Sequence, residues 1–464
     1  MTEQAALRHL GWIGIIRLGL VQTSIGAIVV MTTSTLNRIM VVELALPAMV
    51  PGALVALHYA MQALRPRMGH GSDLGGRRTP WIIGGVIVLA LGGVIASAGT
   101  ALMAASFYAG LLLAIVGFIA IGAGVSAAGT TLLVLLTKRT TEAHRPAAAT
   151  IVWLMMIAGF ALTGSMAGRM LDPFSPLRLV GVTALVCLIA VVVTVFAIWG
   201  IEDNTDAVAA TAPEGPKTAF RAALVETWAD PKARLFTIFV FVSMVAFSAQ
   251  DLILEPFAAI LYNLTVGQTT VLSGLQNQGV FVGMTIVAVA GTAIGGPRLG
   301  SLRLWTIAGC LASALALAGL VVAAFAGRSW PINANVFLLG LANGVYASAA
   351  IASMMSLAGQ GRQSREGVRM GLWGAAQGIA FGLGGFAGTA VSDLVRYIVG
   401  SQTLAYASVF AAEVTLFVLA AVLAARVGDV RHASAVPSTT RGTAIKDGWT
   451  SRWTSTVSVS RGRA

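Results

Sequence analysis

Ionisable side chains inside long apolar stretches are the first residues of this sequence that could do chemistry. Arg38 and Glu43 stand near the end of the first apolar stretch, and Asp251 and Glu255 hold similar places in the seventh. A charge at the bilayer centre costs about 2.5–3.5 kcal/mol on insertion scales, so such residues usually mark a pathway or a paired site. The alternative is that they lie at headgroup level and are solvated. We predict that Arg38 pairs with Asp251.

Two more polar residues lie within apolar stretches. His58 is the only histidine in such a stretch. A neutral imidazole there can ligate the magnesium of a chlorophyll-type macrocycle, or it can hydrogen-bond a neighbouring helix, which is its commoner use. Glu413 lies in the middle of the last stretch, where a protonated acid could face a neighbouring helix, and the sequence assigns it no role.

No pattern typical of catalysis or of a resident metal occurs in the sequence. The chain has two cysteines, Cys187 and Cys310, and each lies alone in an apolar run, which favours packing over metal binding or a disulfide. No phosphate-binding glycine loop, no paired His or Cys spacing and no serine elbow is present. We therefore expect a protein that is not an enzyme and has no metal site of its own.

A short polar loop between the second and third apolar stretches contains Gly69, Asp73, Gly76, Arg77 and Arg78. This spacing resembles the signature loop of the major facilitator superfamily, although leucine follows the aspartate where a basic residue is usual. Glycines allow a tight turn, and an aspartate near a helix N-terminus is favoured by the helix dipole. The simpler interpretation is a basic loop that only fixes orientation in the membrane.

The composition indicates that these residues are positioned by membrane-spanning helices. Only 10% of residues are charged and 57% are hydrophobic, with a mean hydropathy of +0.84, whereas soluble domains have about 25% charged residues. A helix needs about 20 apolar residues to cross a bilayer. Twelve runs are long enough, near 11–36, 43–64, 79–100, 106–137, 147–170, 177–200, 233–258, 268–291, 301–325, 331–358, 368–392 and 402–426.

The runs predict an all-α membrane protein of twelve transmembrane helices in two six-helix halves, the major-facilitator architecture. The first half is 1–200 and the second is 233–426, separated by a polar linker, 201–232. The tail, 427–464, is rich in Ser, Thr and Arg and is expected to be flexible.

The two halves also resemble each other, as parallel repeats do. Glu43 corresponds to Glu255, and a proline follows each of them shortly. Asp172 and Asp393 come near the ends of the fifth and eleventh predicted helices. Matches in the same order along both halves favour a duplicated unit.

The distribution of basic residues predicts the orientation. The net charge of +12 could suggest a nucleic-acid partner, but the Lys and Arg residues fall almost entirely between the apolar runs. With a cytoplasmic N-terminus, most of the 30 basic residues lie in cytoplasmic segments. We therefore predict that both termini are cytoplasmic, that the partner is membrane lipid, and that nucleic acid is not bound.

Glycines spaced by four residues predict faces where helices approach closely. The eleventh predicted helix contains Gly374, Gly378 and Gly382 at four-residue spacing, then Gly384 and Gly388, and the fifth contains Gly164 and Gly168. Such faces more often join helices of one chain than bind a partner.

Three segments together resemble the PucC/LhaA family, the bacteriochlorophyll-delivery branch of the major facilitator superfamily in phototrophic bacteria. They are Leu36–Leu44 with Pro47, the loop Gly69–Asp73, and Gln250–Phe257. The likeness covers roughly 10–426 and excludes the tail.

The resemblance implies that the chain delivers bacteriochlorophyll, as bound cargo, to light-harvesting or reaction-centre complexes during assembly. It also implies antenna polypeptides or a pigment-synthesis enzyme as partners, and the bacterial inner (intracytoplasmic) membrane as location. The cavity candidates are Arg38, Glu43, His58, Asp251 and Glu255. The alternatives are a proton-coupled transporter of a small amphipathic solute, with a buried carboxyl as proton carrier, and a scaffold that binds partner helices without a ligand.

Overall fold

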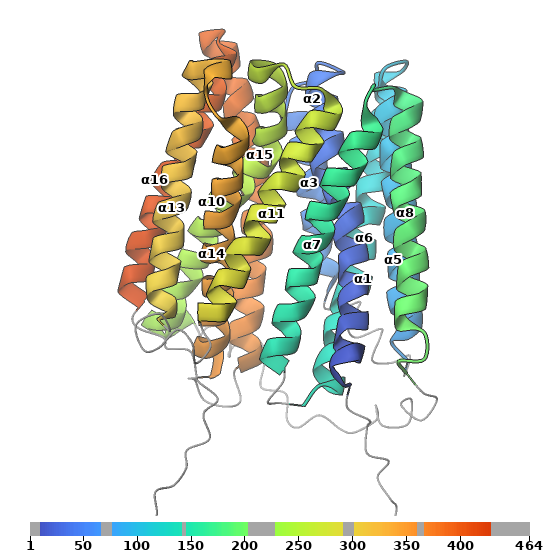
Figure 1. Ribbon diagram of the computed structural model, residues 1–464, viewed down its shortest axis with the longest axis vertical. Helices are drawn as coiled ribbons and strands as arrows, with labels where there is room; N and C mark the ends of the chain where they lie inside the picture. The colour runs from blue at the N-terminus through green and yellow to red at the C-terminus, as the bar shows by residue number, and fades with distance from the viewer. Residues whose placement is uncertain are drawn as a thin grey trace, which may run out of the picture. The chain divides into compact units, whose positions relative to one another are not determined.

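The computed structural model describes residues 10–65, 77–141, 145–202, 228–290, 301–359 and 366–427, and their regular elements are helices (Figure 1). The elements are α1 (Trp12–Val30), a π-helical turn (Met31–Thr35), α2 (Leu36–Val42), α3 (Met49–Ala60), a 3-10 turn (Met61–Leu64), α5 (Thr79–Met103), α6 (Phe107–Arg139), α7 (Arg145–Leu171), α8 (Pro176–Ile198), α10 (Pro231–Tyr262), α11 (Val266–Ala290), α13 (Leu302–Ala326), a 3-10 turn (Gly327–Ser329), α14 (Ile332–Gly359), α15 (Glu366–Val399) and α16 (Gln402–Val427).

Local sequence signals set several helix ends. The side chains of Ser175, Asp230 and Ser301 accept backbone N–H bonds at the starts of α8, α10 and α13, so they satisfy donors that a helix N-terminus leaves open. Asn263 ends α10 in the left-handed conformation, at φ 52°. These caps lie at or near the ends of the predicted apolar runs, where the sequence predicts that helices begin or end.

Within the described ranges, 11 helices are long and apolar enough to span a membrane, and α3 is a shorter apolar helix. The prediction of one continuous helix over 43–64 is therefore wrong in its boundaries. Pro47 and the positive φ of Ala45 (52°) lie before α3, which begins only at Met49. An alanine at positive φ and a proline without an N–H both oppose a continuous helix.

The first span is continuous from Trp12 to Val42 but contains the π turn. The N–H of Leu36 bonds to the carbonyl of Met31, five residues back. A π turn adds a residue to one turn, so it rotates the following residues around the helix relative to a regular α-helix. This rotation decides which side chains of α2 face α10.

Two large hydrophobic clusters form the core. One is built mostly from α1–α8, and the other is built from α10–α16. Where the two sets of helices meet, α7 packs on α11, α3 on α15, and the α1–α2 span on α10. Figure 1 shows α7 and α11 next to each other near the middle of the view.

Glycines explain how closely α7 and α11 approach. A Cβ at Gly164 would lie 2.9 Å from the Cα of Gly274, and a Cβ at Gly168 would lie 2.7 Å from the carbonyl oxygen of Gly267. Neither distance leaves room for a side chain. The prediction of a close-packing face on the fifth helix is thus confirmed.

The predicted packing stripe on α15 is wrong for two of its three glycines. A Cβ at Gly374 or Gly378 would have no neighbour within 4 Å among the described residues, and one at Gly382 would make only ordinary contacts with α3. The tight contacts are at Gly384 and Gly388, against α10. Since each residue turns a helix by about 100°, Gly384 lies on nearly the opposite face from Gly382.

Candidate functional site

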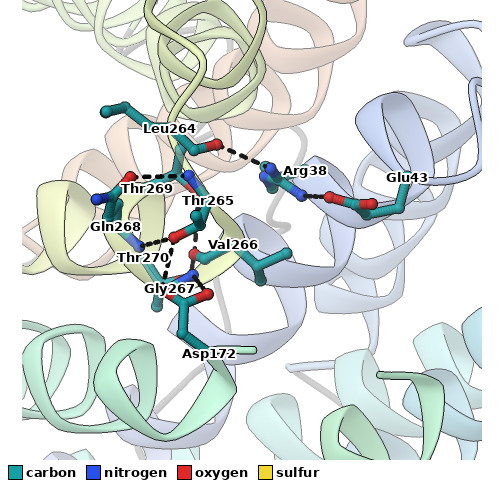
Figure 2. A network of polar contacts seen from close by, with 10 residues as sticks. All are labelled: Arg38, Glu43, Asp172, Leu264, Thr265, Val266, Gly267, Gln268, Thr269 and Thr270. Atoms are coloured by element: carbon teal, nitrogen blue, oxygen red, sulfur yellow. Dashed lines mark hydrogen bonds and ion pairs between the residues drawn. The ribbon is translucent and has the colours of Figure 1, made fainter. Parts of the chain in front are cut away.

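Polar contacts join α2 to the segment that links α10 to α11 (Figure 2). Arg38 is 2% exposed and forms an ion pair with Glu43 on its own segment. Its second terminal nitrogen donates to the carbonyl oxygen of Leu264 at 3.1 Å. The guanidinium therefore ties the end of the first span to the turn before α11.

The predicted pair between Arg38 and Asp251 is not what the structure contains. Asn37, one residue earlier, faces α10 and donates to the carbonyl oxygen of Leu252 at 2.6 Å. The π turn moves each α2 side chain around the helix, so the guanidinium points toward Glu43 and Leu264 instead. Glu43 is 35% exposed and lies at the end of α2, outside the hydrophobic core.

Glu255 on α10 contacts the first span through its buried carboxyl. Its side chain is 1% exposed and accepts a hydrogen bond from Ser34 in the π turn. The Ser34 hydroxyl lies 3.2 Å from that of Ser273 on α11, and the hydroxyls of Thr269 and Ser273 also interact with the carboxyl. Three segments, the π turn, α10 and α11, are thus joined around one acid by hydroxyl groups.

Several buried polar atoms in this region have no hydrogen-bond partner among the described residues. They include Oε2 of Glu255, Oδ1 of Asn37 and both amide atoms of Gln250, which is fully buried on α10. Leaving such an atom unpaired costs about 1–3 kcal/mol, so each needs a ligand, a water or a second conformation to explain it.

Asp251 on α10 and Glu413 on α16 form a second polar group. Glu413 on α16 is 1% exposed, both of its carboxyl oxygens lack partners among the described residues, and it interacts electrostatically with Asp251. Asp251 also interacts with Tyr59 on α3. These carboxyls could carry protons, but no hydrogen-bonded chain joins them among the described residues.

His58 is 1% exposed, and its Nδ1 has no hydrogen-bond partner in the described part of the chain. Its ring lies edge-on to Tyr59 at 4.9 Å, and Tyr59 stacks on Phe381 of α15 at 5.3 Å. Because the imidazole is almost fully covered, a macrocycle could reach it only if neighbouring side chains moved. His58 stays a candidate ligand.

Two aspartates cap helices of the opposite set. Asp172, just after α7, accepts from the N–H of Gly267 at 3.0 Å and from the Thr265 hydroxyl, at the start of α11 (Figure 2). Asp393 on α15 accepts from the N–H of Met49, the first residue of α3, at 2.8 Å. Asp172 and Asp393 were matched to each other in the sequence. Each caps a helix that belongs to the other set.

The signature loop is only partly described, because Gly69, Asp73 and Gly76 lie outside the described residues. Arg77 is exposed and Arg78 is buried at the start of α5. The carboxylate of Glu202 accepts from the N–H of Arg78 and from both the N–H and the hydroxyl of Thr79, at 2.6–3.1 Å. Glu202 therefore caps α5, a role that its place in the predicted linker did not indicate.

An apolar groove lies on the side of the α5–α6 pair. Its volume is about 400 Å³, and Gly84 is exposed on its wall with no atom within 4 Å of a Cβ built there. The remaining lining residues are Pro80, Trp81, Gly85, Val88, Ala123, Gly124 and Ala127. It covers about 12 Å of α5, less than half the thickness of the hydrocarbon core.

Sequence reasoning missed Ser34, Ser273 and Glu202. The run Thr32–Thr35 of hydroxyl residues inside an apolar span was a usable signal, since such residues often bond across membrane helices. Within the described residues, no group of three or more His, Cys, Asp or Glu side chains is arranged to hold a metal ion.

The chain is similar to known proteins over most of its length. The model of the family described as PUCC protein matches residues 35–431. The "Bacteriochlorophyll synthase 44.5 kDa chain" of Rhodobacter capsulatus is 50% identical over 433 residues, which cover 93% of this chain and 99% of that protein. "Protein PucC" of the same organism is 28% identical, covering 88% of this chain and 90% of that protein.

Solved structures show the fold. A crystal structure of a POT peptide transporter matches with a TM-score of 0.63 at 15% identity, covering 91% of this chain and 97% of that one. The nucleoside transporter NupG matches with a TM-score of 0.65 at 12% identity, covering 89% and 98%. The chain is thus a multi-pass membrane protein with the fold of major-facilitator transporters.

Proposed function

The chain belongs to the PucC family, and from this membership we propose that it delivers bacteriochlorophyll during assembly of light-harvesting or reaction-centre complexes. The observation that carries the proposal is the 50% identity, over nearly the full length, to a protein named as a chain of bacteriochlorophyll synthase. The chain has no catalytic motif that we recognise in its sequence. We infer that it handles pigment without transforming it.

The apolar groove on α5 and α6 supports a lipophilic cargo. Its lining is glycine, alanine, valine, proline and tryptophan, and Trp81 offers an aromatic surface on which a flat ring can stack. Bacteriochlorophyll has a large apolar tail, so a carrier exposed to lipid can receive it from the bilayer without moving it through water. The partners that we propose are antenna polypeptides or a pigment-synthesis enzyme.

The proposal extends to organisation and location. We propose two six-helix halves joined by the 201–232 segment, both termini on the cytoplasmic side, and residence in the inner (intracytoplasmic) membrane of a phototrophic bacterium. The separate hydrophobic clusters of α1–α8 and α10–α16 support the two halves.

A proton-coupled transporter of a small amphipathic solute is the second candidate. Its support is a set of carboxyls inside apolar helices, in a fold that transporters share. Glu255 and Glu413 are buried, and Asp251 is half-buried. Carboxyls inside a membrane protein commonly relay protons.

Deleting the gene from its phototrophic host separates the two candidates. Pigment delivery predicts fewer assembled antenna or reaction-centre complexes while bacteriochlorophyll is still made. Absorption spectra of membranes and of pigment extracts measure the two quantities. Normal complexes together with lost uptake or export of a small solute would instead establish the transporter.

Pigment that co-purifies with the full-length protein gives a second test, read from near-infrared absorption. If His58 ligates magnesium, His58→Phe should lower the pigment-to-protein ratio while the folded yield is kept. An unchanged ratio would leave His58 as a packing residue, without deciding the function as a whole.

A further inference from the structure

We propose that Glu255 and the hydroxyl groups around it bind one monovalent metal cation of the size of sodium, between the α1–α2 span and α10–α11. The proposal concerns a site that is independent of pigment. It rests on hydrogen bonds, burial and charge balance at this crossing.

The geometry provides the oxygen ligands. One carboxyl oxygen of Glu255 bonds to Ser34, while the other, Oε2, is buried and has no partner among the described residues. The hydroxyls of Ser34 and Ser273 lie 3.2 Å apart, and the Thr269 hydroxyl also reaches the carboxyl. Hard cations such as sodium and calcium prefer carboxylate, hydroxyl and carbonyl oxygens.

The backbone of the first span supports the same conclusion. Ser34 lies in the π turn, where the normal pattern of helical hydrogen bonds is interrupted. In transporters, irregular backbone at membrane depth is tolerated where it lines a site, and freed carbonyls there coordinate sodium or protons. The π turn brings such a segment beside a buried carboxyl.

Charge balance indicates a single positive charge. Arg38 is the basic residue that attracts Glu255, but it already forms an ion pair with Glu43. The single positive charge of Arg38 is thus shared by the carboxylates of Glu43 and Glu255, so these three residues carry one negative charge without a counterion. A calcium ion would usually need more carboxylates than this site offers, so a monovalent ion fits better.

A proton is the simplest competitor for the same charge. A proton would occupy one carboxyl oxygen only, and Oε2 has no hydrogen-bond partner among the described residues. A metal cation would instead be coordinated by several oxygens at once. Because Ser34 and Glu255 come from opposite sets of helices, the bound ion would also stabilise the contact between them.

Thermal unfolding of the purified full-length protein tests the site. At fixed pH and ionic strength, replacing choline chloride by sodium chloride should raise the Tm by a few degrees and saturate with concentration, as a ligand of the native state does. Potassium chloride should have a smaller effect. The sodium-dependent shift should vanish in Glu255→Gln and shrink in Ser273→Ala.

The matched control is Ser24→Ala, which removes a buried hydroxyl of the same span that bonds only to the Leu20 carbonyl of its own helix. This variant should keep the full sodium-dependent shift. If Glu255→Gln does not fold, binding of radioactive sodium by Ser273→Ala and by the wild type replaces it. Equal Tm values in sodium and choline for the wild type, or a sodium shift that survives in Glu255→Gln, would overturn the proposal.

Discussion

At the scale of single residues, the choice of partner for Arg38 is the most consequential result. A buried guanidinium must be paired, and the sequence offers three carboxylates. Glu43 lies five residues after Arg38, and Asp251 and Glu255 lie at the corresponding place in the seventh predicted helix. The structure pairs it with Glu43 and gives it the Leu264 carbonyl as a second acceptor. Asp251, the partner expected from register, interacts with Tyr59 and Glu413 instead.

A double-mutant cycle measures this pairing. Arg38→Gln and Glu43→Gln should show a coupling free energy of about 0.5–3 kcal/mol, because the two residues are in contact. Arg38→Gln and Asp251→Asn should be additive within about 0.5 kcal/mol. The measurement is the unfolding free energy in detergent, and strong coupling of Arg38 to Asp251 alone would contradict the structure.

At the scale of elements, the α1–α8 helices contact the α10–α16 helices through helix starts as well as through helix faces. Asp172 caps α11 and Asp393 caps α3, so each half supplies a carboxylate to the second predicted helix of the other. A carboxylate there satisfies a free N–H and interacts favourably with the positive end of the helix dipole.

Removing either cap should destabilise the contact by a similar amount. Asp172→Ala and Asp393→Ala are each expected to cost about 0.5–2 kcal/mol of unfolding free energy, as lost N-caps do. Asp172→Asn should cost less, because an amide oxygen still accepts the N–H bond but lacks the charge. Asp393 also pairs with Arg396, so Arg396→Gln controls for the loss of that half-buried pair. A negligible effect of both alanine variants would show that the caps are not stabilising.

The groove between α5 and α6 gives a second prediction at this scale. Gly84→Leu should fill part of the 400 Å³ space and lower co-purified pigment, because the glycine is exposed there and no atom lies within 4 Å of its Cβ position. Gly181→Leu on α8 is the matched control, since that glycine is equally open but lies outside the groove. Equal pigment content in both variants would show that the groove does not bind the pigment.

At the scale of the whole molecule, orientation in the membrane remains a prediction from charge. Reporter fusions near Thr211 and after Val427 should both report a cytoplasmic location, because most of the 30 basic residues lie in segments on that side. Thr211 itself lies outside the described residues. The contrary result would be a periplasmic signal from the fusion near Thr211 together with a cytoplasmic N-terminus. The chain would then cross the membrane an odd number of times before Thr211, which contradicts a first half of six spans.

The sequence by itself determined the class of fold and the family. Long apolar runs must be helical in a bilayer, because no water is present to satisfy their backbone groups, and the segments at Leu36–Leu44 and Gln250–Phe257 are specific enough to indicate the family. The correspondence between Asp172 and Asp393 was also readable, because each lies near the end of a predicted helix at a similar place in the chain order.

Only the tertiary structure decided which polar groups meet. The π turn at Met31–Thr35 and the break before Met49 change the rotation of the following helices, and neither leaves a hydrophobic pattern that reveals it. A shift of one residue turns a side chain by about 100°, so Asn37 faces α10, Arg38 faces Glu43, and Ser34 faces Glu255. In the same way, Gly384 and Gly388, and not the neighbouring stripe, allow α15 to approach α10.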